Sequence, residues 1–203
     1  MRNHSTNLTR KKIIDATLKL FVKNGYHGTS ISQISTATRL TKGTIYFYFK
    51  SKHSLLKGIL EEYERTFLDK MIEEVGSSKG KAIDKMKTFL KFSINFAAKN
   101  QDLIICNINL ATELFSSSKK YEMGVKRIYG KFYKFIADLL EEGKKDGSFR
   151  EDINPKMLAL NLLGANEGNL VQWSINRNIY NDKAEEFSRS YIKFFLNGIC
   201  RNK

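Results

Sequence analysis

The stretch TKGTIYFYFKSK, residues 41–52, places five large apolar or aromatic side chains in succession, Ile45 to Phe49, and flanks them with lysines. Such a short run is compatible with a buried strand or a short helix, because periodicity does not separate the two over so few residues. The rest of the chain favours helix: it has one proline, Pro155, in 203 residues, and its apolar side chains recur at helical spacing. We therefore expect an all-α protein of about nine helices.

The aromatic run lies in the second of two short expected helices, residues 31–38 and 42–48. Ser30, with Gln33 three positions later, has the spacing of a capping box that opens the first helix. Thr41 is a suitable N-cap for the second helix. Two short helices joined by a tight turn form a helix-turn-helix, and in that motif the second helix enters the major groove of DNA.

Positive charge is concentrated around these two helices. Residues 1–60 contain eleven Lys or Arg and one acid, Asp15, and so carry +10 of the whole chain's formal charge of +14. Such a block favours a polyanionic partner, nucleic acid first and an anionic membrane surface second, while a merely solvated basic face is the remaining interpretation. No run approaches the roughly 20 apolar residues that span a bilayer, and the N-terminus lacks an apolar signal region. We expect a cytoplasmic protein that does not insert into a membrane.

Caps and breaks divide the rest of the sequence into longer helices. These are expected over residues 10–24, 52–75, 80–98, 102–115, from Ser117 or Ser118 to 145, 155–175 and 183–200. The last helix opens with a capping box formed by Asp182 and Glu185. We place a helix-turn-helix domain in residues 1–52 and a second helical domain in residues 53–203.

Residues 9–60 contain three specific motifs: Gly25-Tyr26 near the end of the first helix, TKGTIYFYF at residues 41–49, and the Ser51-Lys52 pair that follows. Together they resemble the TetR family of bacterial transcription regulators. Beyond about residue 75 the likeness is one of architecture. The resemblance implies a repressor that binds a palindromic operator as a homodimer, and a C-terminal domain that dimerises and binds a small effector. It implies no cofactor.

The DNA-binding residues implied by this family pattern are Ser30, Ser32, Lys42, Gly43, Thr44, Tyr46, Phe47, Tyr48 and Lys52. Helical spacing agrees, because it turns Ile45 and Phe49 toward the core and leaves Phe47 free to contact thymine methyl groups. Tyr46 and Tyr48 flank this position. Their hydroxyls are expected on phosphates, or their rings serve a chiefly structural role.

Three basic residues require separate interpretation. Arg39 stands where the family usually has glycine, so either it adopts a left-handed conformation or the turn differs slightly. Lys52 opposes the dipole of the helix that it opens, a small cost that a phosphate partner would explain. Arg2 belongs to a segment, MRNHSTNL, that is either a solvated tail or an arm for the minor groove.

The last two expected helices carry a candidate dimer interface. Gly164 and Gly168 are four residues apart on one face, which allows another helix to approach closely, and two such helices per subunit would form a four-helix contact. The alternative is that these faces complete the core of one subunit. The candidate interface residues are Leu160, Leu163, Gly164, Gly168, Val171, Phe187, Tyr191, Phe194 and Phe195.

The second domain also offers apolar walls for an effector pocket, with a few polar groups nearby. The candidate lining residues are Phe67, Phe89, Phe92, Phe96, Ile104, Asn107, Ile108, Glu113, Tyr129, Phe132, Ile136, Asn166, Glu167 and Trp173. Many phenylalanines and few charges favour a hydrophobic effector, either an acyl chain or a planar aromatic drug. Residues 167–180, EGNLVQWSINRNIY, resemble the fatty-acyl-responsive members of the family.

Other classes of function find less support in the sequence. His4, His27 and His53 are scattered, and there is no HExxH or CxxC motif, so we expect neither a metal site nor an enzyme. A membrane-surface or non-specific nucleic-acid-binding module is the alternative to a regulator, since basic residues flank the aromatic run. An interfacial helix needs sustained amphipathicity, however, and residues 42–49 make barely two turns.

Overall fold

The computed structural model describes residues 2–114, 119–175 and 177–200, and almost all of them are helical. Within these ranges the only β-type pairing is an isolated bridge between Phe149 and Cys200. The expected all-α class is confirmed. Ser117 and Ser118, one of which was expected to start a long helix, lie outside the described residues.

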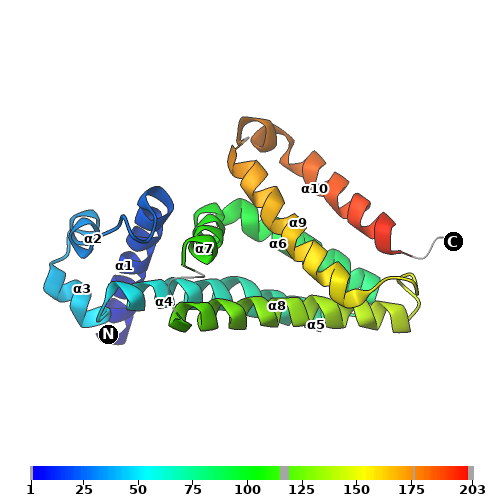
Figure 1. Ribbon diagram of the computed structural model, residues 1–203, viewed down its shortest axis with the longest axis horizontal. Helices are drawn as coiled ribbons and strands as arrows, with labels where there is room; N and C mark the ends of the chain where they lie inside the picture. Colours follow the sequence, from blue (N-terminus) through cyan, green and yellow to red (C-terminus); the bar gives the residue numbers. More distant parts are fainter. Residues whose placement is uncertain (1, 115–118, 176, 201–203) are drawn as a thin grey trace. The chain divides into compact units, whose positions relative to one another are not determined.

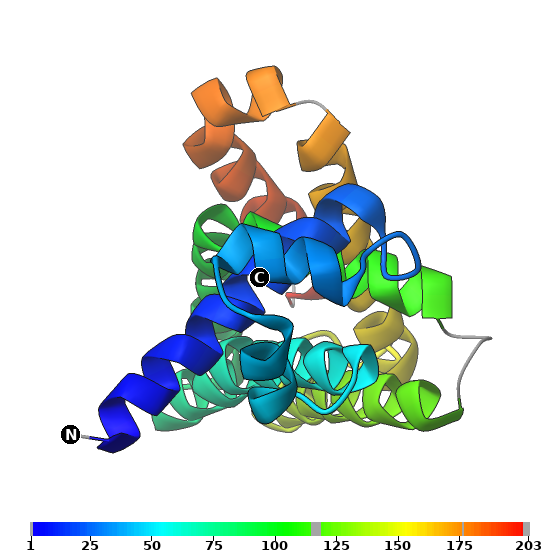
Figure 2. The ribbon, with the colours of Figure 1, turned by 90° about the vertical axis from the view of Figure 1, so that its left-hand side faces the viewer.

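The first three helices are α1 (Arg2–Asn24), α2 (Ile31–Thr38) and α3 (Lys42–Tyr48), and each packs against the next in order (Figures 1 and 2). The bounds of α2 and α3 agree with the sequence expectation. α1 begins earlier than expected, because residues 2–9 contain no glycine or proline that would stop a helix. The segment interpreted as an N-terminal tail or arm is therefore part of α1.

The long expected helix after Ser51 consists of three consecutive segments, α4 (Lys52–Tyr63), η1 (Glu64–Asp69) and α5 (Lys70–Ser77). The middle segment is a π-helix, which the sequence did not predict. Its wider turn brings two neighbouring side chains, Phe67 and Leu68, into the core together.

The remaining helices are α6 (Ala82–Lys99), α7 (Gln101–Leu114), α8 (Lys119–Lys145), α9 (Pro155–Ile175) and α10 (Arg177–Ile199). Asn154 caps α9: its Oδ1 accepts from the backbone N–H groups of Lys156 at 3.1 Å and Met157 at 3.2 Å. Counted with α4, η1 and α5 as one continuous helix, the described residues form nine helices.

The start of α10 differs from the expectation. The helix begins at Arg177, and Lys183, with φ −123° and ψ 18°, interrupts it near the expected capping box. The side chain of Asp182, the expected cap, lies outside the described residues. The sequence signal thus marks the break inside α10.

The chain forms two compact units, each assembled from two separate stretches of the sequence. One unit contains Met1–Arg65 and Gln101–Arg127, and the other contains Thr66–Asn100 and Ile128–Lys203. In the first unit α7 packs against α1 and α4, so a helix from the second half of the chain joins the helix-turn-helix.

Each unit has its own apolar core. In the first, the fully buried side chains include Ile13, Ile34, Ile45, Leu55 and Ile59. In the second they include Leu68, Met71, Met86, Phe89, Leu90, Ile136, Leu140 and Phe149. Ile45 of α3 belongs to the first core, and α3 packs on α2, which together fix the side of α3 that faces outward.

Candidate DNA-binding face and effector region

Local side-chain hydrogen bonds fix the starts of α2 and α3. The Ser30 hydroxyl accepts the N–H of Gln33 at 3.2 Å, and the Gln33 side chain accepts the N–H of Ser30 at 2.7 Å. Thr41 Oγ1 accepts the N–H of Thr44 at 3.1 Å. The capping box and the threonine cap predicted from the sequence are both confirmed.

The turn between the two helices has a left-handed residue, Arg39, with φ 55° and ψ 33°. Its conformation costs roughly 1 kcal/mol for a residue with a Cβ. The turn is stabilised around it, because the backbone N–H of Leu40 donates to the carbonyl of Ser35 at 3.2 Å while the Ser35 hydroxyl donates to the Leu40 carbonyl at 2.5 Å. The turn keeps the geometry that glycine would give, and an exposed guanidinium is added beside α3.

The aromatic run divides between core and surface as helical spacing predicts. Ile45 is 0% exposed and Phe49 is 4% exposed, and both belong to the core of the first unit. Phe47 is 70% exposed and Tyr46 is 45% exposed, while Tyr48 is half-buried with its ring edge-on to Phe47 at 5.2 Å. Exposing two large aromatic side chains is costly for a protein in water, which suggests that a partner covers them.

The other residues predicted to face the groove are also accessible. Lys42 and Gly43 are exposed, and Ser30 and Ser32 are exposed at the start of α2. A Cβ on Gly43 would meet only Thr41 Oγ1, at 3.7 Å, so packing within the subunit does not require glycine there. Close approach by an external partner is a better reason for it.

Thr44 is less available than its neighbours. It is half-buried, and its hydroxyl lies 2.9 Å from the hydroxyl of Thr41, the cap of α3. The two hydroxyls share a hydrogen bond, so a base contact by Thr44 would use its methyl group or its remaining hydrogen-bonding capacity.

Lys52 has a different environment from the one expected of a phosphate ligand. Its Nζ donates to the carbonyl of Tyr26 at 2.9 Å and to the carbonyl of Thr29 at 3.1 Å. It also lies 4.3 Å from the centre of the Tyr26 ring, within cation–π range. Two of the three ammonium donors are thus directed into the α1–α2 loop, residues 25–30.

Glu113, predicted as a polar group of the effector pocket, contacts the same loop. One carboxylate oxygen accepts the N–H of Tyr26 and the other accepts the N–H of His27, each at 3.0 Å. Burial acts to raise the pKa of Glu113, but these two hydrogen bonds, with the charges of His27 and Lys52, lower it below its usual value. The carboxylate is therefore ionised throughout the neutral range.

An aromatic cluster in the second unit brings together five of the predicted pocket residues. The Phe67 ring lies 4.9 Å from Phe96, 5.4 Å from Phe132 and 6.0 Å from Phe92, centre to centre. Phe89 joins it through Phe132, at 6.0 Å. We call these five side chains the phenylalanine cluster.

The remaining pocket candidates are divided between the two units. Ile104, Asn107 and Ile108 belong to α7 in the first unit, and Asn107 donates to the Leu103 carbonyl of its own helix at 2.8 Å. The others belong to the second unit: Tyr129, Ile136, Asn166, Glu167 and Trp173. Asn166 Oδ1 accepts the hydroxyl of Tyr191 at 2.8 Å, so a pocket candidate and an interface candidate are bonded to each other.

Sequence reasoning missed two features beside the phenylalanine cluster. The Ser93 hydroxyl, on α6 between Phe89 and Phe96, is buried and has no partner among the described residues. A hollow of about 460 Å³ runs along α5 and α6, with Phe92 and Phe96 in its wall. Lys91, Asn95 and Lys99 also line it, and their regular spacing of four residues was the signal that could have revealed it.

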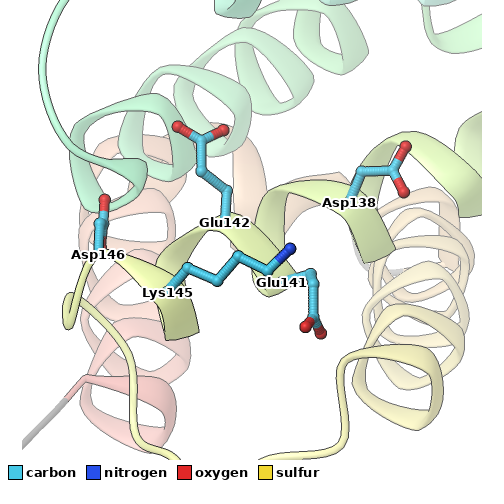
Figure 3. A pocket seen from close by; sticks show the side chains of 5 residues that line it. All are labelled: Asp138, Glu141, Glu142, Lys145 and Asp146. Carbon is cyan, nitrogen blue, oxygen red and sulfur yellow. The ribbon is translucent and has the colours of Figure 1, made fainter.

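A second hollow of about 480 Å³ is lined by acidic residues near the end of α8, and Figure 3 shows its side chains. Glu142 accepts from Lys85 at 2.6 Å. Asp146 accepts the backbone N–H of Ala82, the first residue of α6, at 2.8 Å. It also accepts the backbone N–H of Ser148 at 2.8 Å. Glu142 and Asp146 thus have structural partners, and no group of three or more metal-ligating side chains is found among the described residues.

The candidate dimer face on α9 and α10 contains several exposed apolar side chains. Leu160 is 51%, Val171 42% and Phe194 79% exposed. Among the described residues, no atom outside the adjacent helix backbone lies within 4 Å of a Cβ placed on Gly164 or Gly168. The other three candidates on α10 are half-buried: Phe187, Tyr191 and Phe195. Leu163, in contrast, is 8% exposed and packs inside its own subunit.

The sequence of the chain matches two family profiles. Residues 13–59 match the bacterial regulatory proteins of the tetR family, and residues 60–192 match the C-terminal region of the YsiA-like proteins. The chain belongs to the TetR family of bacterial regulatory proteins. The first profile covers the helix-turn-helix and its supporting helices, and the second covers most of the remaining chain.

Similar proteins extend over nearly the whole length of this TetR-family chain. The fatty acid metabolism regulator protein of Bacillus subtilis (strain 168) is 27% identical over 190 residues, which are 93% of this chain and 94% of that protein. The crystal structure of the MbdR regulator from Azoarcus sp. CIB superposes with a TM-score of 0.84 at 27% identity, covering 95% of this chain and all of that one.

A further neighbour shares the fold at lower identity. The transcriptional regulator FadR from Bacillus subtilis, solved in complex with stearoyl-CoA, has a TM-score of 0.76 and 24% identity, over 93% of this chain and 98% of that chain. Family membership makes the protein a ligand-responsive, DNA-binding regulator of transcription, rather than a membrane-surface module. Among the residues that the structure describes, no helix combines the length and the apolar character needed to cross a membrane.

Proposed function

We propose that this protein is a homodimeric repressor that binds palindromic operator DNA through α3 and releases it when a long-chain acyl compound binds. The observation that carries the DNA-binding part is the face of α3 on which Phe47 is 70% exposed while Ile45, two residues earlier, is fully buried. A capped, rigidly packed helix that presents an exposed aromatic side chain between basic residues fits the major groove.

The DNA contacts divide by chemistry. Phe47 and Thr44 would touch base edges and thymine methyl groups, and Lys42 would donate to guanine or to a phosphate. Tyr46 and Tyr48, with Ser30 and Ser32 at the start of α2, would donate hydroxyls to phosphates. The main chain at Gly43 would approach the DNA closely.

Dimerisation would use the exposed face of α9 and α10. Met157, Leu160, Gly164, Gly168 and Val171 follow one another at spacings of three or four residues, so they share one side of α9. No side chain of the described residues lies within 4 Å of a Cβ placed on either glycine, which leaves room for a partner helix. A twofold contact of this face would present two copies of α3 to the two halves of a palindrome.

This dimer face can be tested with one double variant. Leu160→Arg together with Phe194→Arg adds two charges to the exposed face while sparing Leu163, whose burial makes it a core residue. Sedimentation is expected to show a folded monomer. Met123→Arg changes a side chain that is 70% exposed on α8 and serves as the matched control, expected to stay dimeric. A double variant that sediments as a dimer would refute this interface.

Three features support an acyl effector. The phenylalanine cluster supplies an apolar site, and each buried methylene of a bound chain would contribute about 0.8 kcal/mol. The unpartnered Ser93 hydroxyl supplies a polar group within that apolar region, and Lys91 with Lys99 can attract an anionic head group at the hollow beside it. The name of the 27% identical Bacillus relative indicates fatty acid metabolism for that protein.

The effector is tested by operator release. The DNA is first selected from a random pool by the wild-type protein, and its release is then followed by fluorescence anisotropy. Palmitoyl-CoA is expected to release the DNA, whereas coenzyme A alone is not, because it lacks the apolar chain. Release by a cationic aromatic compound, with none by saturating palmitoyl-CoA, would contradict the acyl effector and favour a drug-like one.

A further inference from the structure

The α1–α2 loop is held from two sides by side chains of opposite charge. Lys52, in the first turn of α4, binds two carbonyl groups of the loop, and Glu113, near the end of α7, binds two consecutive N–H groups. Four main-chain groups of one short loop are thus satisfied by two side chains. Hydrogen bonds to charged groups are about twice as strong as neutral ones, so this loop is fixed more firmly than an ordinary connection.

The loop is shaped to receive these contacts. Gly25 ends α1 with φ +72°, and a Cβ at that position would lie 3.2 Å from the Glu113 carboxylate. The Thr29 side chain is buried and its hydroxyl lies 2.9 Å from the Gly25 carbonyl, which ties the two ends of the loop together. Tyr26 packs edge-on against Phe21 at 5.4 Å and offers its ring to Lys52.

The position of the loop bears directly on the helix-turn-helix. Thr29, whose carbonyl accepts from Lys52, immediately precedes Ser30, the cap of α2. A shift of the loop therefore moves the start of α2, and with it α3, which packs on α2. Neither Lys52 nor Glu113 has to touch DNA to influence how α3 meets it.

α7 connects this arrangement with the C-terminal region. By sequence α7 lies within residues 60–192, which match the C-terminal family profile, but it packs against α1 and α4 in the first unit. Figure 2 shows α7 beside the α1–α2 loop. Through its residue Glu113, α7 accepts hydrogen bonds from the main chain of that loop.

We propose that Lys52 and Glu113 are positioning residues for operator binding, which fix the α1–α2 loop and, through Glu113, make the orientation of α2 and α3 depend on the position of α7. This assigns Lys52 a role inside the protein in place of the phosphate contact that the family pattern implies. The inference rests on the operator binding proposed above, and its test therefore includes a measurement that needs no DNA.

The first test replaces Glu113 with Gln, which keeps the size of the side chain but removes its charge and one acceptor. In the DNA-free protein, amide hydrogen exchange at Tyr26 and His27 is expected to accelerate at least tenfold. In a separate binding measurement, affinity for the selected operator is expected to fall roughly tenfold, which is the effect of losing one charge-assisted hydrogen bond. Glu73→Gln makes the same change at an exposed position on α5 and is expected to alter neither quantity.

The second test separates the two roles of Lys52. Lys52→Arg can still donate to both carbonyls, so amide exchange in the loop and operator affinity are expected to remain within about threefold of wild type. Lys52→Met is expected to accelerate exchange and to weaken binding. Lys50→Met removes a neighbouring exposed charge and is expected to leave loop exchange unchanged.

The outcomes distinguish this inference from the proposed function. If the wild-type protein selects no DNA sequence, the proposed operator binding is wrong, while accelerated amide exchange in the loop of Glu113→Gln would still show that Glu113 holds the α1–α2 loop. If amide exchange in the loop is unchanged in both Glu113→Gln and Lys52→Met, these two side chains do not hold the loop. If exchange accelerates but operator affinity is unaffected, the two side chains only stabilise the loop and the positioning role is overturned.

Discussion

The helix-turn-helix and the phenylalanine cluster are built in opposite ways. In the first, the decisive contacts join residues three to five positions apart: Ser30 with Gln33, Thr41 with Thr44, and Ser35 with Leu40. In the second, the rings come from η1, α6 and α8, and Phe67 meets Phe132 across 65 residues of sequence. Local contacts make a rigid face of fixed chemistry, whereas contacts over long sequence separations make a region whose shape depends on how several helices pack.

The largest effect on stability is expected in the second region. Phe132→Ala removes a ring that is 8% exposed and contacts both Phe67 and Phe89. The free energy of unfolding should fall by about 3–5 kcal/mol, through lost burial and the cavity that remains. Urea unfolding measures it, and a loss below 1 kcal/mol would show that the cluster is loosely packed.

A smaller effect is expected at the loop that the helix-turn-helix shares with α7. Gly25→Ala places a Cβ at φ +72° and 3.2 Å from the Glu113 carboxylate. We expect a loss of roughly 1–2 kcal/mol from the backbone strain, seen as a lower thermal midpoint. Gly130→Ala, at an exposed position within α8 that has no proposed role, is the control and is expected to leave stability unchanged or slightly raised.

Loss of a local cap should cost less again. Ser30→Ala removes the acceptor for the Gln33 N–H and is expected to destabilise the protein by about 1 kcal/mol. Because the loss is confined to one helix start, amide exchange should accelerate within α2 and not in the second unit. Acceleration spread equally over both units would contradict the local character of this region.

The smallest effect on stability is expected for Phe47→Ala. Like Phe132→Ala it removes a phenyl ring, but the ring of Phe47 is exposed whereas that of Phe132 is buried. Phe47 contributes to no core, so urea unfolding should change by less than about 0.5 kcal/mol. Affinity for the selected operator should fall at least tenfold, since a groove contact is lost. A large loss of stability would mean that Phe47 is a structural residue.

The sequence predicted the first region well because its signals are local. The bounds of α2 and α3, the caps at Ser30 and Thr41, and the inward side of α3 all follow from residue types within one or two turns. Arg39 shows the limit of this reasoning. The sequence left two conformations of the turn open, and in the folded chain, where α3 packs on α2, Arg39 is left-handed.

The rest could not be predicted because it depends on which helices meet. The sequence offers Lys52 as a phosphate ligand, and only the fold shows that the carbonyls of Tyr26 and Thr29 lie within reach of its ammonium. The sequence likewise offers Glu113 as a pocket residue, and only the packing of α7 on α1 shows that its carboxylate accepts from the α1–α2 loop. Periodicity shows that α7 has a buried side, but it does not show which helix covers it.

The central claim is that the exposed side of α3 reads operator DNA as part of a symmetric dimer. Its most direct test is selection from a random pool of duplex DNA by the wild-type protein, followed by sequencing and by measuring the mass of the complex. We expect an enriched palindrome bound by an even number of subunits, with the enrichment lost in Phe47→Ala. Recovery of unrelated sequences with no common motif, or the same motif from Phe47→Ala as from wild type, would contradict it.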